Sequence, residues 1–194
     1  NQPLGNTIGN AIEIREAIET LKGHGPKDFT ELCMQAAEIM LMQGKVAENK
    51  EEARKMLDEV VASGKAFETF KDMVKAQGGN VDMIENPELL PQSKFKTEIK
   101  SEESGNVKVL HSERLGVLAM QLGAGRETKE QDVNHAVGLE LACKRGDKVN
   151  KGDTICIVYH DEELKPQWVD ELYHAFELTN EEVAPQPIIE KVLS

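Results

Sequence analysis

Residues 146–153 read GDKVNKGD and separate two apolar runs, residues 138–143 and residues 154–159. Glycine tolerates the backbone angles that a sharp reversal requires, and this segment has one glycine near each end. The aspartate after each glycine can accept hydrogen bonds from turn amides. Val149 lies between the two Gly-Asp pairs, where an apolar side chain can anchor the tip. The pattern therefore predicts two strands that are joined by a structured turn.

The residues around this turn predict an α+β domain over residues 95–194. Phe95, Thr97 and Ile99 alternate with lysine and glutamate, which is the period of a half-buried strand. The further elements are expected, in order, as a turn at residues 104–106, a strand over residues 107–111, a helix over residues 115–122 that ends at Gly123, strands over residues 138–143 and 154–159, and a helix over residues 168–178.

The first half of the chain has the period of helices instead. Apolar residues at helical spacing predict four helices, over residues 8–21, 28–44, 50–62 and 66–76. Asp28 and Glu31 stand three residues apart at the start of the second helix, which predicts a capping box. The methionines of this half also fall at helical spacing, so we expect core packing for them: Met34, Met40, Met42 and Met56.

A segment that contains Pro87 and Pro91 separates the two halves and has neither period. Because it is short, we expect it to pack on the surface rather than to form a free tether. The predicted organisation is a helical part over residues 1–80, a linker strap over residues 81–94 and an α+β domain over residues 95–194.

The composition excludes several classes of function. The net charge is −12 and the pI is about 4.9, whereas binding to nucleic acid or to an anionic membrane needs clustered basic residues. No apolar stretch approaches the roughly 20 residues that span a bilayer, and residues 1–10 show no signal peptide. We therefore expect a cytoplasmic protein with neither a nucleic acid nor a membrane as its partner.

Cysteine and histidine give no sign of a metal or redox site. The three cysteines, Cys33, Cys143 and Cys156, are odd in number and not closely spaced, so they predict neither a disulfide framework nor a zinc site. Cys143 and Cys156 stand in apolar runs and are expected to be buried thiols. The acidic run at residues 161–163 is expected to be a solvated turn. The histidines are scattered, and surface positions are expected for all five: His24, His111, His135, His160 and His174.

The opening of the chain, residues 1–17, reads NQPLGNTIGNAIEIREA and resembles the segment that follows a core strand in thymidine and pyrimidine-nucleoside phosphorylases. The resemblance continues in order through KGHGPKD at residues 22–28, TEL at 30–32, AQGG at 76–79, LPQ at 90–92, LGAGR at 122–126, AVGL at 136–139 and the GDKVNKGD turn. Ordered matches over essentially all 194 residues are far more specific than any single motif. The turn alone also occurs in hammerhead and barrel-sandwich domains, including biotinyl and lipoyl carriers.

The resemblance implies a fold of the α/β family. This chain would supply a helical segment of the α/β domain, followed by an α+β hammerhead (barrel-sandwich-like) C-terminal domain. The implied activity is that of a pentosyltransferase of pyrimidine salvage, which uses phosphate to cleave pyrimidine nucleosides to the base and a pentose 1-phosphate. The implied partners are a pyrimidine nucleoside and phosphate, and the full-length family is a homodimer.

The resemblance also places the catalytic residues outside this chain. In the family, the glycine-rich phosphate loop and the arginine and lysine that hold the pyrimidine precede the segment that residue 1 matches. No glycine-rich loop here follows a strand and opens a helix, as a phosphate cradle requires. The nearest candidate, residues 123–126, predicts a turn, and Arg126 is expected to form a structural ion pair. We therefore expect no catalytic or cofactor-binding residue in this chain and no activity from it alone.

One site of the family does map onto this chain. The phosphorylases bind a monovalent cation such as potassium, or a calcium-like ion, and the match implies the carbonyl oxygens of Leu4 and Thr7 and the carboxylate of Glu16 as ligands. Hard cations prefer oxygen ligands of this kind. Without the resemblance, Glu16 would be interpreted as an exposed helical acid. Three ligands are few for an ion that takes about 6–8 oxygens, so we expect weak binding, or none, in this chain.

The alternative is a non-catalytic structural or carrier-like hammerhead module. Carriers of biotin or lipoate have a modifiable lysine on the hairpin that follows a turn like residues 146–153. Alignment of residues 152–158 with that pattern puts Glu162 at the position of the lysine. Because an acid cannot form the amide, carrier function is disfavoured, and a purely structural domain stays open.

Overall fold

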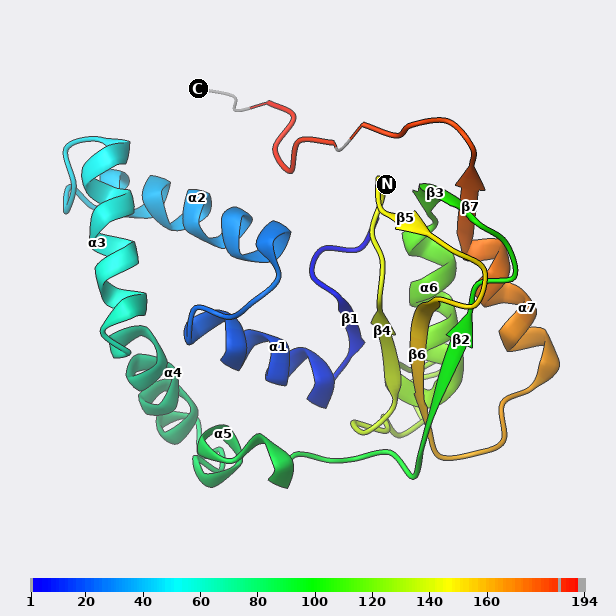
Figure 1. Cartoon of the computed structure of the whole chain (residues 1–194). Helices are drawn as coiled ribbons and strands as arrows, with labels where there is room; N and C mark the ends of the chain where they lie inside the picture. The colour runs from blue at the N-terminus through cyan, green and yellow to red at the C-terminus, as the bar shows by residue number, and fades with distance from the viewer. Residues whose placement is uncertain (1, 185, 192–194) are drawn as a thin grey trace. The chain divides into compact units, whose positions relative to one another are not determined.

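The computed structural model describes residues 2–184 and 186–191. Contacts divide the chain into two compact units. The β-rich unit comprises residues 1–14 and 90–186, and the helical unit comprises residues 15–89 and 187–194. Figure 1 labels the helices and strands of both units. A helical region is followed by antiparallel sheets, but the first 14 residues, which were expected in the helical part, group with the sheets.

The helical region contains the four predicted helices and two short ones. Their bounds are Ala11–Leu21 for α1, Lys27–Gln43 for α2, Lys50–Ala62 for α3, Lys65–Ala76 for α4 and Asp82–Glu85 for α5, and a 3-10 turn follows at Pro87–Leu89. Helix α3 has the predicted bounds because local chemistry sets its start. The Asn49 side chain accepts a hydrogen bond from the Glu52 amide at 2.9 Å, and the Glu52 carboxylate accepts one from the Glu48 amide at 2.8 Å.

The sequence-based predictions for the starts of the first two helices are wrong. The first helix begins at Ala11 rather than Ile8, because residues 7–9 form a strand. The capping box of the second helix does not form. Its N-cap is Pro26, which has no side-chain cap bond. Asp28 Oδ1 instead accepts from the amide of the next residue at 2.8 Å, and Glu31 pairs with Arg54.

A cluster of charged side chains joins α2 to α3. The Arg54 guanidinium donates to both carboxylate oxygens of Glu31, at 3.0 and 2.8 Å, and its Nε donates to Glu38. Glu38 is only 4% exposed, so it depends on this partner. The apolar face expected for α2 is less buried than predicted, since Met40 is 69% exposed and Cys33 is exposed.

The β-rich unit contains two antiparallel sheets and two helices. The four-stranded sheet has the order β1-β4-β6-β2, with bounds Thr7–Gly9, Gly138–Leu141, Thr154–His160 and Phe95–Lys100. The three-stranded sheet has the order β5-β3-β7, with bounds Lys148–Val149, Gly105–Leu110 and Phe176–Thr179. Helix α6 spans Ser112–Ala119 and continues into a π-helical turn at Met120–Ala124, and α7 spans Pro166–Ala175.

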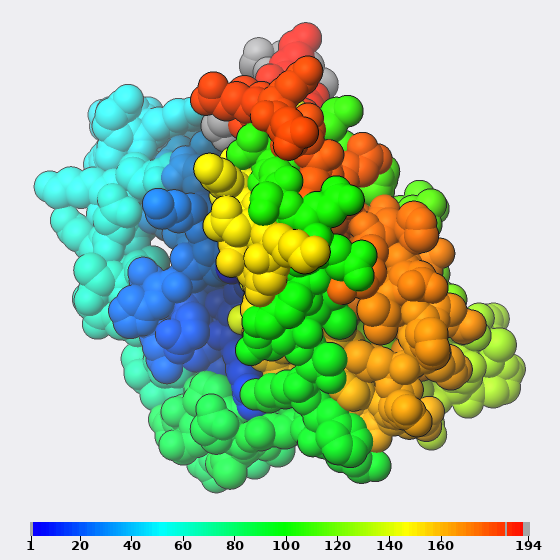
Figure 2. Space-filling model, turned by 45° about the vertical axis from the view of Figure 1, so that its right-hand side comes forward, coloured from blue at the N-terminus to red at the C-terminus, as the bar shows by residue number. Residues whose placement is uncertain are grey.

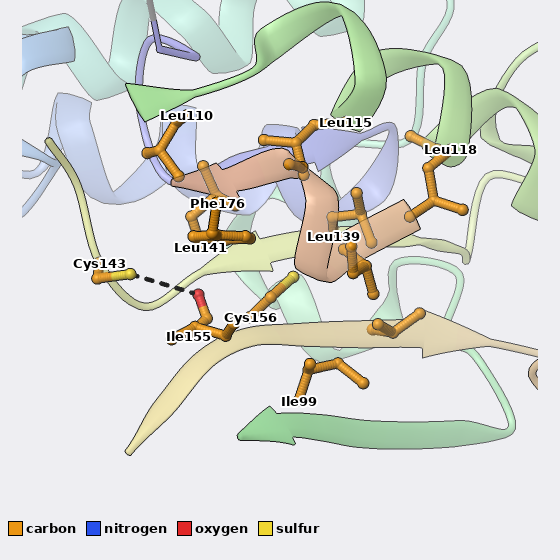
Figure 3. Packing of buried hydrophobic residues seen from close by; sticks show 14 of the residues in the cluster. Ile99, Leu110, Leu115, Leu118, Leu139, Leu141, Cys143, Ile155, Cys156 and Phe176 are labelled. Atoms are coloured by element: carbon orange, nitrogen blue, oxygen red, sulfur yellow. Dashed lines mark hydrogen bonds between the residues drawn. The ribbon is translucent and has the colours of Figure 1, made fainter. Parts of the chain in front are cut away.

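The core of this unit lies between the sheets and the two helices. Figure 3 shows Leu139 and Leu141 of β4 and Cys156 of β6 facing Leu115 and Leu118 of α6. All five side chains are at most 3% exposed. Alternate residues of β4 and β6 thus cover one face of the sheet, as a half-buried strand pattern requires.

Long-range pairing also changes the last predicted helix. Helix α7 starts at Pro166, which suits the first helical position because proline lacks an amide hydrogen there. It ends at Ala175 rather than at residue 178. The residues that follow it pair with β3, where Phe176 lies opposite Leu110. Residues 176–178 therefore form a strand because an edge of β3 is available to them.

Two glycines face each other where β1 pairs with β4. Gly9 lies opposite Gly138 in the register. A Cβ on Gly138 would lie 2.5 Å from the carbonyl oxygen of Ile8 and 2.7 Å from a methyl group of Ile12. A Cβ on Gly9 would lie 2.9 Å from the carbonyl oxygen of Val137. The first strand therefore reaches the sheet only because both positions lack a side chain.

Substitution of Gly138 by alanine tests this contact. We expect Gly138→Ala to lower the free energy of unfolding by about 2–3 kcal/mol, because the new methyl group meets backbone that cannot move away freely. Gly116→Ala, in α6, is the control, since no atom lies within 4 Å of its added Cβ. There the change should be neutral or stabilising by about 0.5–1 kcal/mol. Urea unfolding of both variants measures the difference, and equal effects would contradict the close approach.

The charged cluster predicts a specific sensitivity to acid. Hydrogen bonds from Arg54, and then from Gln35, lower the pKa of Glu31 from 4.5 to about 2. A carboxyl with a lowered native pKa stabilises the folded state fully above the unfolded pKa, and this contribution is lost as the pH falls through the native pKa. We therefore expect Glu31→Gln to reduce the loss of stability between about pH 4 and pH 2. Urea unfolding of the wild type and of Glu31→Gln at pH 7 and pH 3 measures this loss of stability.

Removal of the arginine should cost more than removal of Glu31. Arg54→Met leaves Glu38 buried without its partner, which costs about 3 kcal/mol. Arg114→Met removes the pair between Arg114 and Glu171, whose side chains are 48% and 49% exposed, and should cost less than about 1 kcal/mol. If both arginine variants unfold at the same urea concentration, the cluster does not stabilise the α2–α3 pair.

Candidate functional site

The segment of residues 2–6, named here the N-terminal segment, lies along residues 141–145. The Leu141 amide donates to the carbonyl oxygen of Asn6 at 2.7 Å, and the Arg145 amide donates to Gln2 Oε1 at 2.9 Å. The Lys144 ammonium group donates to the carbonyl oxygen of Pro3 at 2.7 Å and also to that of Gly5. This arrangement fixes the backbone that contains Leu4, one of the predicted cation ligands.

The register of β1 determines where the Thr7 carbonyl points. Asn6 and Leu141 exchange a ladder hydrogen bond, so the next pair, Thr7 and Glu140, is a non-hydrogen-bonded pair of the antiparallel ladder. The backbone polar groups of Thr7 therefore point away from β4, toward the edge of the sheet, because β1 is an edge strand. Thr7 Oγ1 is buried and has no hydrogen-bond partner among the described residues. The carbonyl oxygen of Thr7, which is the atom that the resemblance implies as a ligand, thus suits a hard cation.

The three predicted cation ligands do not all belong to one unit. Leu4, which is 42% exposed, and Thr7 lie in the β-rich unit, whereas Glu16 lies in the part of α1 that belongs to the helical unit. Glu16 is half-buried, and its carbonyl oxygen accepts from Thr20 Oγ1 at 2.7 Å. Among the described residues, no group of three or more histidine, cysteine, aspartate or glutamate side chains could hold a metal ion. This result concerns side-chain ligands only. The predicted site is built mainly from backbone carbonyl oxygens, so it stays a prediction.

The GDKVNKGD turn has the structure that its residues predict. Gly146 and Gly152 have φ values of 94° and 93°. Asp147 Oδ2 accepts from the Lys144 amide at 2.7 Å, and Asp153 Oδ2 accepts from the Asn150 amide at 2.8 Å. The predicted anchor is confirmed, since Val149 is 3% exposed. Figure 2 shows the turn, in yellow, at the surface beside the green segment of β2 and β3. Its aspartates bond to nearby amides, and its backbone bonds to residues 101, 104 and 107, so it is a structural element.

The cysteines of the β-rich unit are buried, as predicted. Burial raises the pKa of the Cys143 thiol to about 12, with a further contribution from the nearby Asp147 carboxylate. Burial also raises the pKa of Cys156, which is 0% exposed. The Cys143 thiol points at the carbonyl oxygen of Ile155, at 3.9 Å (Figure 3). A thiol that stays protonated at neutral pH is a poor nucleophile and a poor metal ligand.

One histidine departs from the surface position that we expected. His160 is 7% exposed, and its Nδ1 lies 2.6 Å from the carbonyl oxygen of Glu162. Because a carbonyl only accepts, Nδ1 holds a hydrogen, and in the neutral ring Nε2 accepts from the Thr97 hydroxyl at 2.8 Å. Both ring nitrogens are used to fix the end of β6, so His160 has a structural role.

The acidic run after β6 is more ordered than a solvated turn. Asp161 accepts from the Asn134 side chain at 2.7 Å and from the Lys94 amide at 2.7 Å. These hydrogen bonds, that from Asn134 first, lower the pKa of Asp161. The carboxylate therefore ties the start of β2 and the loop before β4 to the end of β6.

The nearest candidate for a phosphate loop is a turn, as expected. Gly123 has a φ of 107°, and its carbonyl oxygen accepts from the Asn134 amide at 2.8 Å. The carbonyl oxygen of Ala124 accepts from the Asn10 side chain at 2.8 Å. The ion pair predicted for Arg126 is absent from the described part of the chain, where this residue is exposed. The turn is held by neutral amides and shows no built anion site.

A surface hollow of about 590 Å³ lies between α6 and α7, and sequence reasoning did not find it. Its lining residues are Glu113, Arg114, Val117, Leu118, Gln121, Gln167, Trp168 and Glu171. Arg114 and Glu171 already pair across it at 2.7 Å. The hollow contains no nucleophile beside a base, so it lacks the groups that a catalytic cleft needs.

As to membranes, none of the described helices has the length and apolarity to cross one.

Comparison with known proteins gives two kinds of match. The family model for the pyrimidine nucleoside phosphorylase C-terminal domain matches residues 106–179, a range that extends from β3 to the end of β7. Pyrimidine-nucleoside phosphorylase of Staphylococcus aureus strain USA300 is 43% identical over 194 residues, which is 100% of this chain and 45% of that protein. The protein of the same name from strain MSSA476 is 44% identical over 193 residues, 100% of this chain and 44% of that protein.

The chain spans about 45% of the length of these curated relatives. The likeness covers both units, whereas the domain match lies wholly within the β-rich unit. A helical region, antiparallel sheets and a matched C-terminal domain agree with the resemblance of the opening residues and of the turn. The chain is therefore similar over its whole length to the C-terminal portion of the pyrimidine-nucleoside phosphorylases.

Proposed function

We propose that this chain acts as the C-terminal portion of a pyrimidine-nucleoside phosphorylase, an enzyme that uses phosphate to cleave pyrimidine nucleosides to the base and a pentose 1-phosphate. The supporting observation is the 43% identity to a named pyrimidine-nucleoside phosphorylase over all 194 residues. Within that enzyme, the chain would supply a helical segment of the α/β domain and an α+β domain of the hammerhead type. The full enzyme would be a homodimer that binds a pyrimidine nucleoside and phosphate.

The contribution of this chain to the reaction is a framework. Phosphorolysis requires cations and hydrogen-bond donors that are positioned around phosphate and the departing base. The Arg54 cluster supports a framework role, because this guanidinium already pairs with Glu31 and Glu38 within the helical unit. The helical unit also exposes several large apolar side chains. They are Met40, Val46, Val60, Met73 and Leu89.

The alternative, a carrier-like module, has less support. A carrier needs its modified residue at the tip of a hairpin between two paired strands. Glu162 follows β6, but the chain then enters α7 at Pro166 rather than a strand that pairs with β6. The residue type and the local structure both disfavour carrier chemistry, and a purely structural module remains the second candidate.

The first test is an assay of the chain by itself. We expect no release of base above background when the 194-residue chain is incubated with uridine or thymidine and phosphate, because the chain spans about 45% of the relatives' length and the resemblance assigns no catalytic residue to it. Absorbance of the free base is the measurement, and the full-length Staphylococcus aureus relative is the positive control. Clear turnover by the chain alone would contradict the framework role.

We also propose the family's cation site, with the carbonyl oxygens of Leu4 and Thr7 and the carboxylate of Glu16 as ligands for potassium or a calcium-like ion. The Thr7 backbone, directed toward the edge of the sheet, supports it. The remaining ligands would come from elsewhere in the full-length enzyme and from water, since such ions take about 6–8 oxygens.

The charge of Glu16 is the test of the cation site. In the full-length enzyme, Glu16→Gln should weaken cation binding by at least about tenfold, since even changes outside the ligand set cost 10–100-fold. Glu19→Gln, on the same helix, and Thr7→Ala, which keeps the backbone ligand, should bind nearly as the wild type does. Cation-dependent thermal unfolding gives the affinities. An unchanged affinity in Glu16→Gln would return this residue to an ordinary helical acid.

A further inference from the structure

The Lys144 side chain ends at two backbone carbonyl groups of the N-terminal segment. Its Nζ lies 2.7 Å from the carbonyl oxygen of Pro3 and also donates to that of Gly5. Lys144 is half-buried and Gly5 is buried. Gly5 has a φ of 70°, a conformation that glycine adopts without strain. The bend at Gly5 allows the carbonyls on both sides of Leu4 to face one ammonium group.

Two converging carbonyls are also a site for a monovalent cation. Proteins bind potassium through backbone carbonyl oxygens that replace its hydration shell. The ammonium group of lysine is a compact point charge with three donors, and it is close to potassium in size. A cation attached to the chain has a high effective concentration at its site, so it needs no supply from solution.

The ammonium group gives the N-terminal segment hydrogen bonds that have a charged donor. Two further hydrogen bonds of the segment, from Leu141 to Asn6 and from Arg145 to Gln2, join neutral groups. Hydrogen bonds with one charged partner contribute about twice as much as neutral ones. The position of residues 2–6 therefore depends more on Lys144 than on any of these neutral contacts.

We propose that Lys144 is a positioning residue that acts as a built-in monovalent cation. Its ammonium group occupies a cation site formed by the carbonyl oxygens of Pro3 and Gly5 and thereby holds the N-terminal segment against residues 141–145. Removal of the charge opens this site to ammonium or potassium ions from solution. The inference does not depend on the proposed reaction or on Glu16, since every atom in it lies within the β-rich unit.

Hydrogen exchange in the full-length protein tests the inference. In tetramethylammonium chloride, whose cation is too large for the site, Lys144→Met should raise exchange of peptides from residues 2–9 and 139–146 by about tenfold or more. Potassium or ammonium chloride at the same ionic strength should restore most of the protection. The wild type should respond equally to all three salts. Lys148→Met, an exposed lysine of the same turn, is the matched control and should exchange like the wild type.

Three results would overturn the inference. Wild-type exchange in Lys144→Met would show that the ammonium group does not hold the segment. Equal exchange of Lys144→Met in all three salts would show that the carbonyls form no cation site. An increase in Lys148→Met as large as that in Lys144→Met would show that the general charge of the turn is what matters. Lys144→Arg, which keeps a cation with several donors, should retain at least part of the protection in every salt.

Discussion

The β-rich unit depends on a contact between two backbones that lie too close for side chains. Gly9 and Gly138 are 129 positions apart in the sequence and opposite each other in the register of β1 and β4. This contact sets Thr7 opposite Glu140 and Asn6 beside Leu141, so it also determines where the N-terminal segment runs. The same register brings the Ala11 amide to the carbonyl oxygen of His135, at 3.0 Å, where α1 begins. One steric requirement thus positions a strand, a helix start and a segment of irregular backbone.

Local chemistry is the part of this fold that could be predicted from the sequence. The aspartates of the GDKVNKGD turn accept from amides three residues away, and Asn49 caps α3 at the same separation. Such interactions form wherever the residue types occur at the right spacing, because the chain itself keeps the partners close. The strands that flank the turn were predictable for a similar reason, since their alternation reflects one buried face. The burial of Cys156 follows from that pattern.

Three of the wrong predictions involve a partner that is distant in the sequence. Ile8 has a helical spacing to the apolar residues after it, but it pairs with Leu139 in a strand. Phe176 continues the apolar face of α7, but it pairs with Leu110. Glu31 is placed for a capping box, but a bidentate contact with Arg54 is stronger than a cap bond. In each case a long-range interaction replaces the local one, and the sequence alone does not show that the partner is near.

The residues of the candidate site also differ in whether the sequence could reveal them. Leu4, Thr7 and Glu16 were named through resemblance, because a carbonyl ligand is independent of its side chain and no residue pattern reveals it. The role of Lys144 could not be predicted, because its acceptors are also backbone oxygens. They belong to Pro3 and Gly5, and nothing in these residue types marks them as partners of a lysine. Backbone ligands are found from coordinates or from relatives.

A framework of this kind affects a reaction through geometry alone. Burial raises the pKa of the Cys143 thiol, and His160 uses both ring nitrogens in hydrogen bonds. Groups of this kind are poorly placed to attack a substrate. They can still be important for catalysis, because a displacement of about 1 Å at a reacting group can cost about 100-fold in rate. In a phosphorylase, this framework would therefore act by keeping other groups accurately placed. The turn, the paired glycines and the contacts of Lys144 with the N-terminal segment would contribute to this without touching the substrate.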